Sequence, residues 1–327
     1  MIIARTPVRI SFAGGGSDLR AYYKHGYGAV VSTAINKYMY VMVNKTFDHH
    51  IRVIYSRIEY VEKIDNIEHD LAREALKLLG INQNGLDIAY MGDMLPAHTG
   101  SGLGASSSLT VGILNALHTL KGEKVSAETL AREACRIEIE ILGRPIGKQD
   151  QYAAAYGGLN YIKFNRDESV DVTPLACRPE TLEKLNRNLL LFHTGLNTQS
   201  DNILSEQNEK TFDNLTVLDR MVGLAEELKK AVMSDDLTEF GKILHDGWIH
   251  KQKLANGITN PAIDNYYGKA KEAGAIGGKI LGSGGGGFLL LYCEEQNQNK
   301  VRKALPDLRE APFGFEPEGS KIIYTSN

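Results

Sequence analysis

Residues 100–108 read GSGLGASSS, and the run LTVGILNALHTL follows them directly at 109–120. Apolar residues recur in the second run at helical spacing, which predicts a helix over 106–120. Glycines let backbone N–H groups turn inward, and a helix presents its positive end at its N-terminus, so this segment is typical of a phosphate site. The serine hydroxyls can donate to phosphate or ligate a magnesium ion. The alternative is a flexible glycine-serine loop with a serine N-cap.

Two common phosphate-binding motifs do not match the chain. A Walker A loop requires serine or threonine after the Gly-Lys at 147–148, where this chain has Gln149, and a first glycine where it has Leu142. A dinucleotide-binding fingerprint requires a glycine at the position of Ser107 and a preceding strand, and residues 96–99 are not strand-like. The sequence therefore argues against P-loop NTPases and Rossmann dehydrogenases.

Two further segments combine glycine with functional side chains or with an apolar run. Asp150 lies in GKQDQY (147–152) and is a candidate general base, and Lys148 would keep it ionised and contact a transferring phosphoryl group. The alternative is an aspartate that caps the following helix. Residues 282–287 contain five glycines and lead into an apolar run, which favours close approach of a ligand or of another backbone. The alternative there is tight packing between loops.

Length, composition and charge restrict the class of protein. The chain has 327 residues, 43% of them hydrophobic, which is enough for two domains with full cores. A charged, proline-containing stretch at 174–188 predicts domains over 1–180 and 181–327. The net charge of −3 comes without a basic stripe, which argues against nucleic-acid binding. No apolar run approaches the ~20 residues that span a bilayer. We therefore expect a soluble, cytoplasmic protein with no membrane partner.

The order of the predicted elements favours an α+β fold. Strand-like patterns lie at 2–12, 29–43, 86–90, 189–193 and 288–292, and helical patterns lie at 106–120, 126–141, 213–233 and 236–254. Ser126 is a good N-cap for the second helix, whose apolar face contains Leu130, Ala134, Ile137 and Ile141. Strands and helices mix without strict alternation, so a doubly wound parallel sheet is not expected.

Three of these segments together resemble the motifs of the GHMP kinases, the family named after galactokinase and the homoserine, mevalonate and phosphomevalonate kinases. The first motif resembles PVRISFAGGGSD (7–18), the second the segment from Pro96 to Ser108, and the third the glycines of 282–287. The resemblance covers the whole chain in the family's order. It implies an N-terminal domain like domain 2 of ribosomal protein S5, a ferredoxin-like C-terminal domain and an active site between them.

Within the family, three stretches resemble kinases of D-glycero-D-manno-heptose 7-phosphate: RTPVRISFAGGGSDL (5–19), GKQDQYAAAYGGLNYI (147–162) and GGKILGSGGGGFLLLY (277–292). The resemblance implies transfer of a phosphoryl group from ATP, with Mg²⁺, to the anomeric hydroxyl, on the route to nucleotide-activated heptose. L-fucose kinases share the glycine-rich first motif and are the nearest alternative. Galactokinases carry a Gly-Glu-His-Thr-Asp type of segment where this chain has residues 14–18. An alternative of another class is a non-catalytic protein that binds nucleotide or sugar phosphate.

The resemblance also implies roles for individual residues. Asp150 matches the catalytic aspartate that accepts the hydroxyl proton, and Arg9 matches the arginine that steadies charge near the γ-phosphoryl group. The residues expected to bind ATP are Gly100, Ser101, Gly102, Leu103, Gly104, Ala105, Ser106, Ser107 and Ser108. The residues expected to contact the sugar are Gly15, Gly16, Ser17, Asp18, Lys148, Gly284 and Gly285.

Ser106 matches the family's serine ligand of magnesium, and Glu138 is the expected carboxylate ligand because of its distance before Asp150. Glu140 is the alternative, since a helical wheel places both glutamates at the margins of the apolar face. The phosphate of the sugar requires a cationic site, for which the candidates are Lys251, Lys253, Arg20 and Lys24. Each of these is also consistent with a solvated basic surface. His245 and His250 are expected to be surface or cap residues, not metal ligands.

Overall fold

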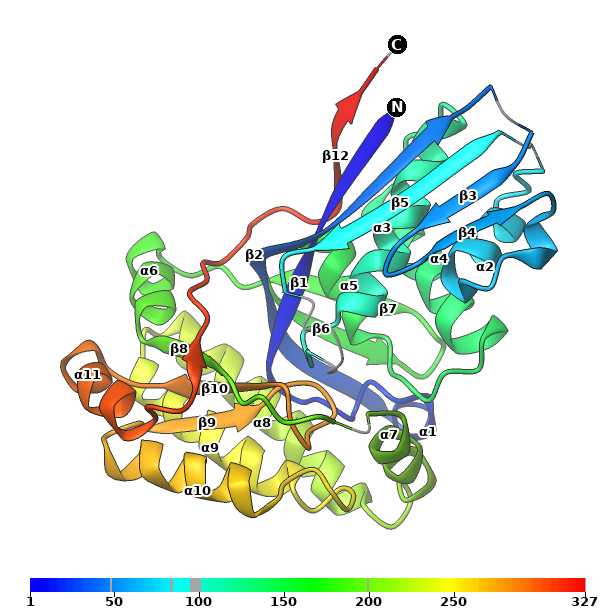
Figure 1. The fold of residues 1–327 in the computed structure, drawn as a ribbon. Coiled ribbons are helices and arrows are strands. Elements are labelled where there is room, and N and C mark those ends of the chain that lie inside the picture. Colours follow the sequence, from blue (N-terminus) through cyan, green and yellow to red (C-terminus); the bar gives the residue numbers. More distant parts are fainter. Residues whose placement is uncertain (48, 83–84, 95–100, 199, 327) are drawn as a thin grey trace.

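The computed structural model describes residues 1–327 except 48, 83–84, 95–100, 199 and 327, and shows two β-sheets, each with helices packed against it (Figure 1). The strands of the larger sheet are β1 (Ile2–Ala13), β2 (Tyr27–Lys45), β3 (Ile51–Ile54), β4 (Ile58–Val61), β5 (Leu86–Gly92), β6 (Leu159–Asn165), β7 (Val170–Pro174) and β12 (Lys321–Thr325). Their order is β12-β1-β2-β5-β3-β4, and β6 pairs with β2 and β7. The pairing of β3 with β5 is parallel, and the other pairs are antiparallel.

Helices pack against both sheets. They are α1 (Arg20–Tyr23), α2 (Asp70–Leu78), α3 (Ala105–Leu120), α4 (Ala127–Cys135), α5 (Gln149–Tyr156), α6 (Pro179–Arg187), α7 (Ser200–Glu209), α8 (Leu215–Met233), α9 (Leu237–Lys251), α10 (Pro261–Glu272) and α11 (Glu295–Ala304), with a 3₁₀ turn at Ile64–Asn66 and a π-helical turn at Arg136–Ile141. Helices α3 and α8 both contact β1 and β2. No helix in the described part of the chain has an apolar stretch long enough to cross a bilayer.

Helix α3 confirms the pattern expected at 106–120. Its residues Leu109, Ile113 and Leu117 are buried, because the helical repeat places them on the face that packs against the larger sheet. Gly104 precedes the helix with φ of 74°, a left-handed conformation that suits glycine. The glycine-rich loop therefore turns sharply into the helix N-terminus, as the phosphate-site interpretation requires.

The helix expected over 126–141 changes its winding partway. Ser126 caps α4 by accepting a hydrogen bond from the Thr129 N–H at 3.1 Å, as expected. After Cys135 the chain continues as the π-helical turn, and Ile141 is 45% exposed instead of lying on the buried face. A π turn holds more residues than an α turn, so the side chains that follow are rotated relative to the α-helical pattern.

The smaller sheet contains β8 (Leu189–His193), β9 (Gly277–Ile280), β10 (Phe288–Tyr292) and β11 (Arg309–Glu310) in the order β11-β8-β10-β9, all antiparallel. In sequence order this is 4-1-3-2, with helices between the first and second strands and between the third and fourth. That is the β-α-β-β-α-β arrangement of ferredoxin-like domains. The α+β class and the ferredoxin-like second domain are therefore confirmed.

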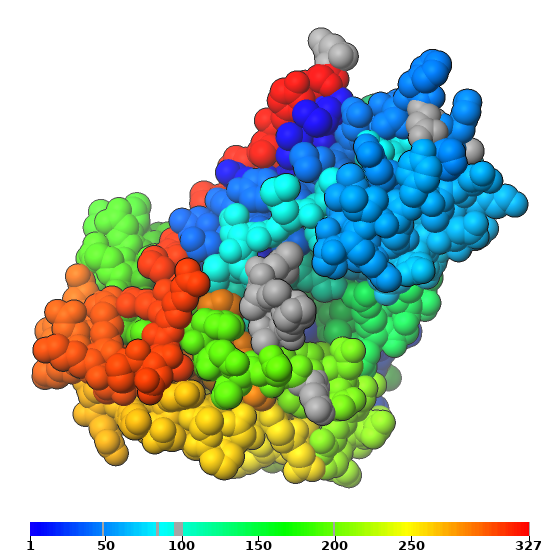
Figure 2. All heavy atoms as spheres, in the orientation of Figure 1, coloured from blue at the N-terminus to red at the C-terminus, as the bar shows by residue number. Residues whose placement is uncertain are grey.

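The end of the chain returns to the larger sheet. Strand β12 pairs with β1, for example Ile2 with Thr325, and Figure 2 shows the C-terminal segment beside the N-terminal strand. A bridge between Ile35 and Phe315 connects the same segment to β2. The predicted second domain, 181–327, therefore does not correspond to one sheet, because its last strand completes the edge of the first domain. Hydrophobicity patterns reveal a strand but not the sheet that it joins.

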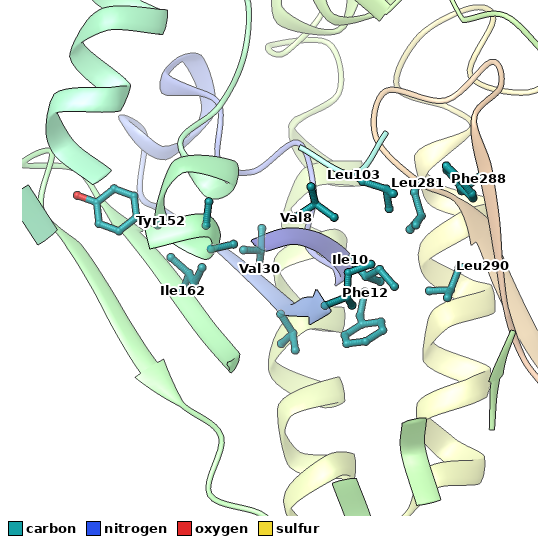
Figure 3. Close-up of a cluster of buried hydrophobic side chains, with 14 of the residues drawn as sticks. Val8, Ile10, Phe12, Val30, Leu103, Tyr152, Ile162, Leu281, Phe288 and Leu290 are labelled. Carbon is teal, nitrogen blue, oxygen red and sulfur yellow. The ribbon is translucent and has the colours of Figure 1, made fainter. Parts of the chain in front are cut away.

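The two sheets share a continuous hydrophobic core along β1. In Figure 3, Val8, Ile10 and Phe12 of β1 lie between residues of the N-terminal domain and Phe288 of β10. The rings of Phe12 and Phe240 meet edge to face with centroids 5.1 Å apart, which connects β1 to α9. This core fixes the relative position of the two halves, and the segments that carry glycine meet above it.

Candidate active site

A cleft of about 790 Å³ brings the glycine-containing segments of both halves together. Its lining includes β1, the loops at 15–19 and 101–104, the π-helical turn, the start of α5, helix α7 and the segment 282–283. A cavity of this volume lies within the range of small-molecule sites. The segments are far apart in sequence, so the cleft exists only in the folded chain.

Arg9 and Asp150 form a bidentate ion pair at the base of the cleft. The Arg9 Nε and Nη2 groups donate to the two carboxylate oxygens of Asp150, each at 2.7 Å, and Nη1 donates to the Gly102 carbonyl at 2.6 Å. The Arg9 side chain is 5% exposed and that of Asp150 is 23% exposed. A carboxylate has about four lone-pair sites, so Asp150 keeps acceptor capacity toward the cleft. The pair therefore orients the candidate base and ties it to the glycine-rich loop.

The π-helical turn places the two candidate glutamates in different surroundings. Glu138 is fully buried in the lining of the cleft, whereas Glu140 is exposed and lines a separate cavity. The Glu138 Oε1 atom accepts from the Ser106 hydroxyl at 3.1 Å, and Oε2 accepts from the Gln151 amide at 2.7 Å. Burial raises the pKa of Glu138, although these hydrogen bonds oppose the shift. The expected pair Ser106 and Glu138 is thus brought together.

A guanidinium group now sits between the oxygens expected to hold magnesium. Arg144 donates to the Ser106 hydroxyl at 2.7 Å, to Glu138 Oε1 at 3.1 Å and to Asp70 Oδ2 at 2.8 Å. These oxygens suit Mg²⁺, which usually binds one or two protein oxygen ligands together with waters and phosphates. Among the described residues no cluster of three or more His, Cys, Asp and Glu side chains forms a cation cage. The Ser106 hydroxyl and the Glu138 carboxylate are oxygen donors of the kind that magnesium binds.

Asp18 is another carboxylate of the cleft. Its side chain is 4% exposed and accepts hydrogen bonds from the N–H groups of Gly16 at 3.0 Å and Gln149 at 3.3 Å. A Cβ atom at Gly147 would collide with the Asp18 carboxylate, so a glycine is required there. Burial, together with the charge of Asp150, raises the pKa of Asp18. The first motif and the Asp150 segment thus meet at one carboxylate.

The nucleotide loop is placed largely as expected. The residues of the predicted ATP site that line the cleft are Ser101, Gly102, Gly104, Ala105, Ser106 and Ser107. Leu103 is buried in the core, and the Ser108 hydroxyl donates to the Pro7 carbonyl at 2.8 Å, so both support the loop from behind. Gly100 lies outside the described residues.

Four expected sugar contacts are absent from the cleft lining, whereas Gly15, Gly16 and Asp18 belong to it. The Ser17 hydroxyl donates to the carbonyls of Gly14 and Ala29 and stabilises the turn. Gly284 and Gly285 pack against the backbone of the segment 257–258. Lys148 directs its ammonium group to Glu168. A sequence motif identifies these glycines and this lysine, but it does not show whether each one faces the cleft or the opposite side of its loop.

The four basic residues expected to bind the phosphate of the sugar lie in different parts of the structure. Arg20 and Lys24 form ion pairs with Glu168 at 2.9 and 2.7 Å, and Lys148 joins them. Although burial opposes it, hydrogen bonds from Lys148, Lys24 and Tyr23 lower the pKa of Glu168 to about 2. Lys253 is exposed, and Lys251 alone of the four candidates lines the cleft.

The two histidines take structural roles. The His245 ring hydrogen bonds to the Tyr267 hydroxyl at 2.7 Å and stacks on its ring. The His250 ring hydrogen bonds to the Asp246 carbonyl of its own helix at 2.9 Å.

Several polar residues of the cleft besides Arg144 were not expected from the sequence, among them Lys279, Ser11 and Gln149. Lys279 of β9 lines it, although its only signal was a charged residue within an apolar strand pattern. The Ser11 hydroxyl and the Gln149 Oε1 atom also belong to lining residues, and each is buried without a hydrogen-bond partner in the described part of the chain. Unpaired buried polar atoms are uncommon, so these two atoms mark a surface suited to a polar ligand.

Comparison with known proteins agrees with this geometry. Residues 66–158 match the GHMP kinases N terminal domain, and residues 224–310 match the GHMP kinases C terminal domain. The two matches together span more than half of the chain, and both the fold and the motif order agree with them. The chain belongs to the GHMP kinase family, and it is an ATP-dependent phosphotransferase.

Particular relatives narrow the comparison. The chain is 28% identical to a D-glycero-alpha-D-manno-heptose 7-phosphate kinase of Campylobacter jejuni, over 98% of each chain. It is 26% identical to an L-fucokinase/L-fucose-1-P guanylyltransferase of Bacteroides fragilis, over 94% of this chain and 36% of that protein. Among solved structures, a D-glycero-D-manno-heptose 1-phosphate kinase of Bacteroides thetaiotaomicron superposes with a TM-score of 0.81 at 26% identity, over 100% of both chains.

Proposed function

We propose that this protein is a sugar 1-kinase that transfers the γ-phosphoryl group of ATP to the anomeric hydroxyl of D-glycero-D-manno-heptose 7-phosphate. The observation that carries the proposal is the position of Asp150. A Cβ atom at Gly104 would lie 3.1 Å from Asp150 Oδ2, so the carboxylate lies directly beside the predicted nucleotide loop, and Asp18 lies in the same cleft. A base between a phosphate loop and a polar pocket is the arrangement that phosphoryl transfer to a hydroxyl requires.

Each group of residues in the cleft has its own role in the proposed reaction. The Gly102–Gly104 loop and the N-terminus of α3 bind the phosphates of ATP through N–H groups and the helix dipole. Ser106 and Glu138 would hold Mg²⁺, which would neutralise charge on the phosphates. Asp18 accepts hydrogen bonds from sugar hydroxyls. Asp150 takes the proton of the C1 hydroxyl. As it does so, the C1 oxygen of the sugar forms a bond to the γ-phosphorus, and the bond from the γ-phosphorus to the β–γ bridging oxygen breaks and releases ADP.

Positioning and charge account for most of the expected rate gain. Arg9 holds Asp150 in place and brings a positive charge next to the glycine-rich loop, where negative charge accumulates in the transition state. Because ATP and a sugar phosphate are metabolites of the cell interior, we also propose that the enzyme works in the cytoplasm.

The identity of the sugar rests on the names of relatives, and these names differ in one respect. The Campylobacter protein is named for a 7-phosphate and the Bacteroides structure for a 1-phosphate. A 1-phosphate has no free anomeric hydroxyl, so transfer to it would have to occur at another oxygen. L-fucose is the second candidate substrate, supported by the Bacteroides fragilis relative.

A substrate panel with product analysis tests the proposal. Purified protein, ATP and Mg²⁺ are incubated with heptose 7-phosphate, heptose 1-phosphate, L-fucose and galactose, and ADP release is followed. We expect turnover with the 7-phosphate to exceed that with the others, and ³¹P NMR to show the 1,7-bisphosphate. Higher turnover with L-fucose or the 1-phosphate would replace the proposed substrate. No ADP release with any of these sugars, while nucleotide binds, would show that the acceptor lies outside the panel.

Asp150→Asn tests the catalytic assignment directly. Because asparagine cannot take the hydroxyl proton, we expect turnover to fall by roughly 10²- to 10⁴-fold, with ATP affinity retained. Turnover by the coupled assay and nucleotide binding by calorimetry measure the two effects. Asp171→Asn, a surface change on β7, serves as the matched control. Near-normal turnover of Asp150→Asn would remove this residue from the role of base.

A further inference from the structure

Two lysine side chains are buried in the wall that the C-terminal half contributes to the cleft. Lys251 is the last residue of α9 and is 6% exposed, and Lys279 lies in β9 and is 3% exposed. Both belong to the lining of the cleft. Lysine is among the residues least often buried, so two of them in one wall require an explanation.

Neither ammonium group has an ion-pair partner among the described residues. The Lys279 Nζ atom donates to the Phe12 carbonyl at 3.3 Å. The Lys251 Nζ atom donates to the Ile280 carbonyl at 3.3 Å and to the Gly282 carbonyl. An ammonium group has three N–H donors, so these carbonyls satisfy one donor of Lys279 and two of Lys251. The remaining N–H donors of both side chains have no partner among the described residues.

The nearest charged groups do not neutralise the pair. Arg9 adds positive charge and is itself paired with Asp150, so the local excess of charge is positive. Burial first, then the charge of Arg9, lowers the pKa of Lys279 to about 7. Burial, Lys279 and Arg9 lower the pKa of Lys251 well below its usual range. Asp18 attracts both ammonium groups and Asp150 attracts Lys251, and both carboxylates line the same cleft as the lysines.

A buried amine can carry its positive charge only at a large desolvation cost, which an anionic ligand would offset. We propose that Lys251 and Lys279 form a phosphate-binding subsite that takes a phosphate monoester in the cleft. The proposal rests on the proposed function for the kind of ligand, since both the sugar substrate and the transferring group carry phosphate. A doubly charged phosphate with three free oxygens matches two ammonium groups with unused donors. The source of the phosphate is either the sugar's own phosphate or the γ-phosphoryl group in transfer.

Binding of inorganic phosphate tests the subsite without any turnover. We expect millimolar phosphate to raise the Tm of the wild-type protein, because a ligand of the folded state stabilises it, and the double variant Lys251→Met/Lys279→Met to lose that increase. The double variant should be at least as stable as the wild type in phosphate-free buffer, because methionine fills the space without a charge. Lys242→Met, at an exposed position of α9, is the matched control and should keep the phosphate effect.

Kinetics of the single variants Lys251→Met and Lys279→Met identify the source of the phosphate. If the sugar's phosphate occupies the subsite, KM for heptose 7-phosphate should rise by roughly 10- to 100-fold, and by clearly more than KM for the dephosphorylated sugar. If the γ-phosphoryl group occupies it, kcat should fall by a similar factor with every sugar, and KM for the sugar should remain. Either pattern supports the subsite.

Three results would overturn the subsite. These are an unchanged Tm of the wild-type protein in phosphate, a full phosphate effect in the double variant, and kinetics within twofold of wild type in both single variants. If the double variant does not fold, crystals of the wild-type protein soaked in tungstate provide the test, and an anomalous peak beside both Nζ atoms is expected. A different preferred sugar in the substrate panel would overturn the proposed function alone, because the phosphate-dependent Tm shift would remain.

Discussion

The guanidinium group of Arg144 holds several oxygen atoms of the cleft together. Arg144 joins three oxygen atoms from Ser106, Glu138 and Asp70, a donor set that also suits a divalent cation. The fully buried carboxylate of Glu138 therefore has a cationic neighbour. A buried carboxylate without a cation would be costly, so the arginine stabilises Glu138 in its ionised form.

Replacement of the two neighbouring glutamates should separate their roles. Glu138→Gln removes the charge that would hold magnesium, and we expect the Mg²⁺ concentration for half-maximal activity to rise by about 10-fold or more. Glu140→Gln changes an exposed residue and should leave the magnesium requirement unchanged. Activity is measured as a function of Mg²⁺ at constant ATP. The opposite pattern would assign the metal to Glu140.

Lys279 makes stability depend on pH in a defined direction. Its pKa is about 7 in the folded protein and 10.5 in a free lysine, with Arg9, Asp18 and Lys251 facing it. Between these values the unfolded state binds more protons, so the free energy of unfolding should rise with pH from about 7 to 10.5. Lys279→Met lacks this contribution. Urea unfolding at pH 7, 8 and 9 should show the wild type gaining stability relative to the variant, and parallel curves would contradict the prediction.

Two loops, one from each half of the chain, are in close backbone contact at Gly102 and Gly282. Gly282 has φ of 69°, and a Cβ atom there would overlap the Cα atom of Gly102 in the nucleotide loop. The Lys251 ammonium group holds the Gly282 carbonyl from the other side. The third motif therefore supports the nucleotide loop and does not need to touch the ligand itself.

Gly282→Ala should disturb this contact. A left-handed non-glycine residue and the overlap with Gly102 together should lower the free energy of unfolding by more than ~1 kcal/mol and raise KM for ATP. Gly268→Ala in α10 has no atom within 4 Å of the new Cβ and should be neutral or stabilising by up to about 1 kcal/mol. Chemical denaturation and ATP titration measure both effects. Equal behaviour of the two variants would show that the loop contact is unimportant.

At the scale of the whole molecule, the chain begins and ends in the same sheet. Strand β12 covers the edge of β1, and the Ser320 hydroxyl bonds with the Thr6 hydroxyl at 2.8 Å and accepts from the Asn115 amide at 3.0 Å. The crossing segment thus ties the C-terminal half to the domain that carries Arg9. The relative position of the halves, and with it the cleft, depends on this closure.

Removal of residues 320–327 should therefore weaken the N-terminal domain more than the C-terminal one. The deletion leaves the backbone groups of β1 without their partner strand, so we expect a Tm lower by several degrees and faster hydrogen exchange in β1. Exchange in β8 and β10 should change little. Tyr324→Ser, at an exposed position of β12, is the control with a small expected effect. Equal loss of protection in both sheets would contradict the prediction.

Much of the fold was predictable because local patterns persist in the folded chain. The strands at 189–193 and 288–292 are β8 and β10 with the predicted bounds, and the buried positions of α3 follow the helical repeat. The distance before Asp150 favoured Glu138, but a helical wheel did not separate it from Glu140, because the wheel assumes α-helical winding and the chain makes a π turn there. Lys148 was expected to contact the substrate, and its ammonium group lies against Glu168, since a motif does not show which way a long side chain points.

The sequence by itself determined the chemistry available to this protein: a glycine-serine loop before a helix, an aspartate and an arginine in short motifs, and strands and helices in the order of a GHMP kinase. Tertiary structure decided which of these groups meet. In the folded chain Arg9 pairs with Asp150, and Glu138 accepts a hydrogen bond from Ser106. Lys148 contacts Glu168, and Lys251 is buried near Lys279. Charge interactions act through space over a few ångströms, and only the packing of distant segments sets those distances.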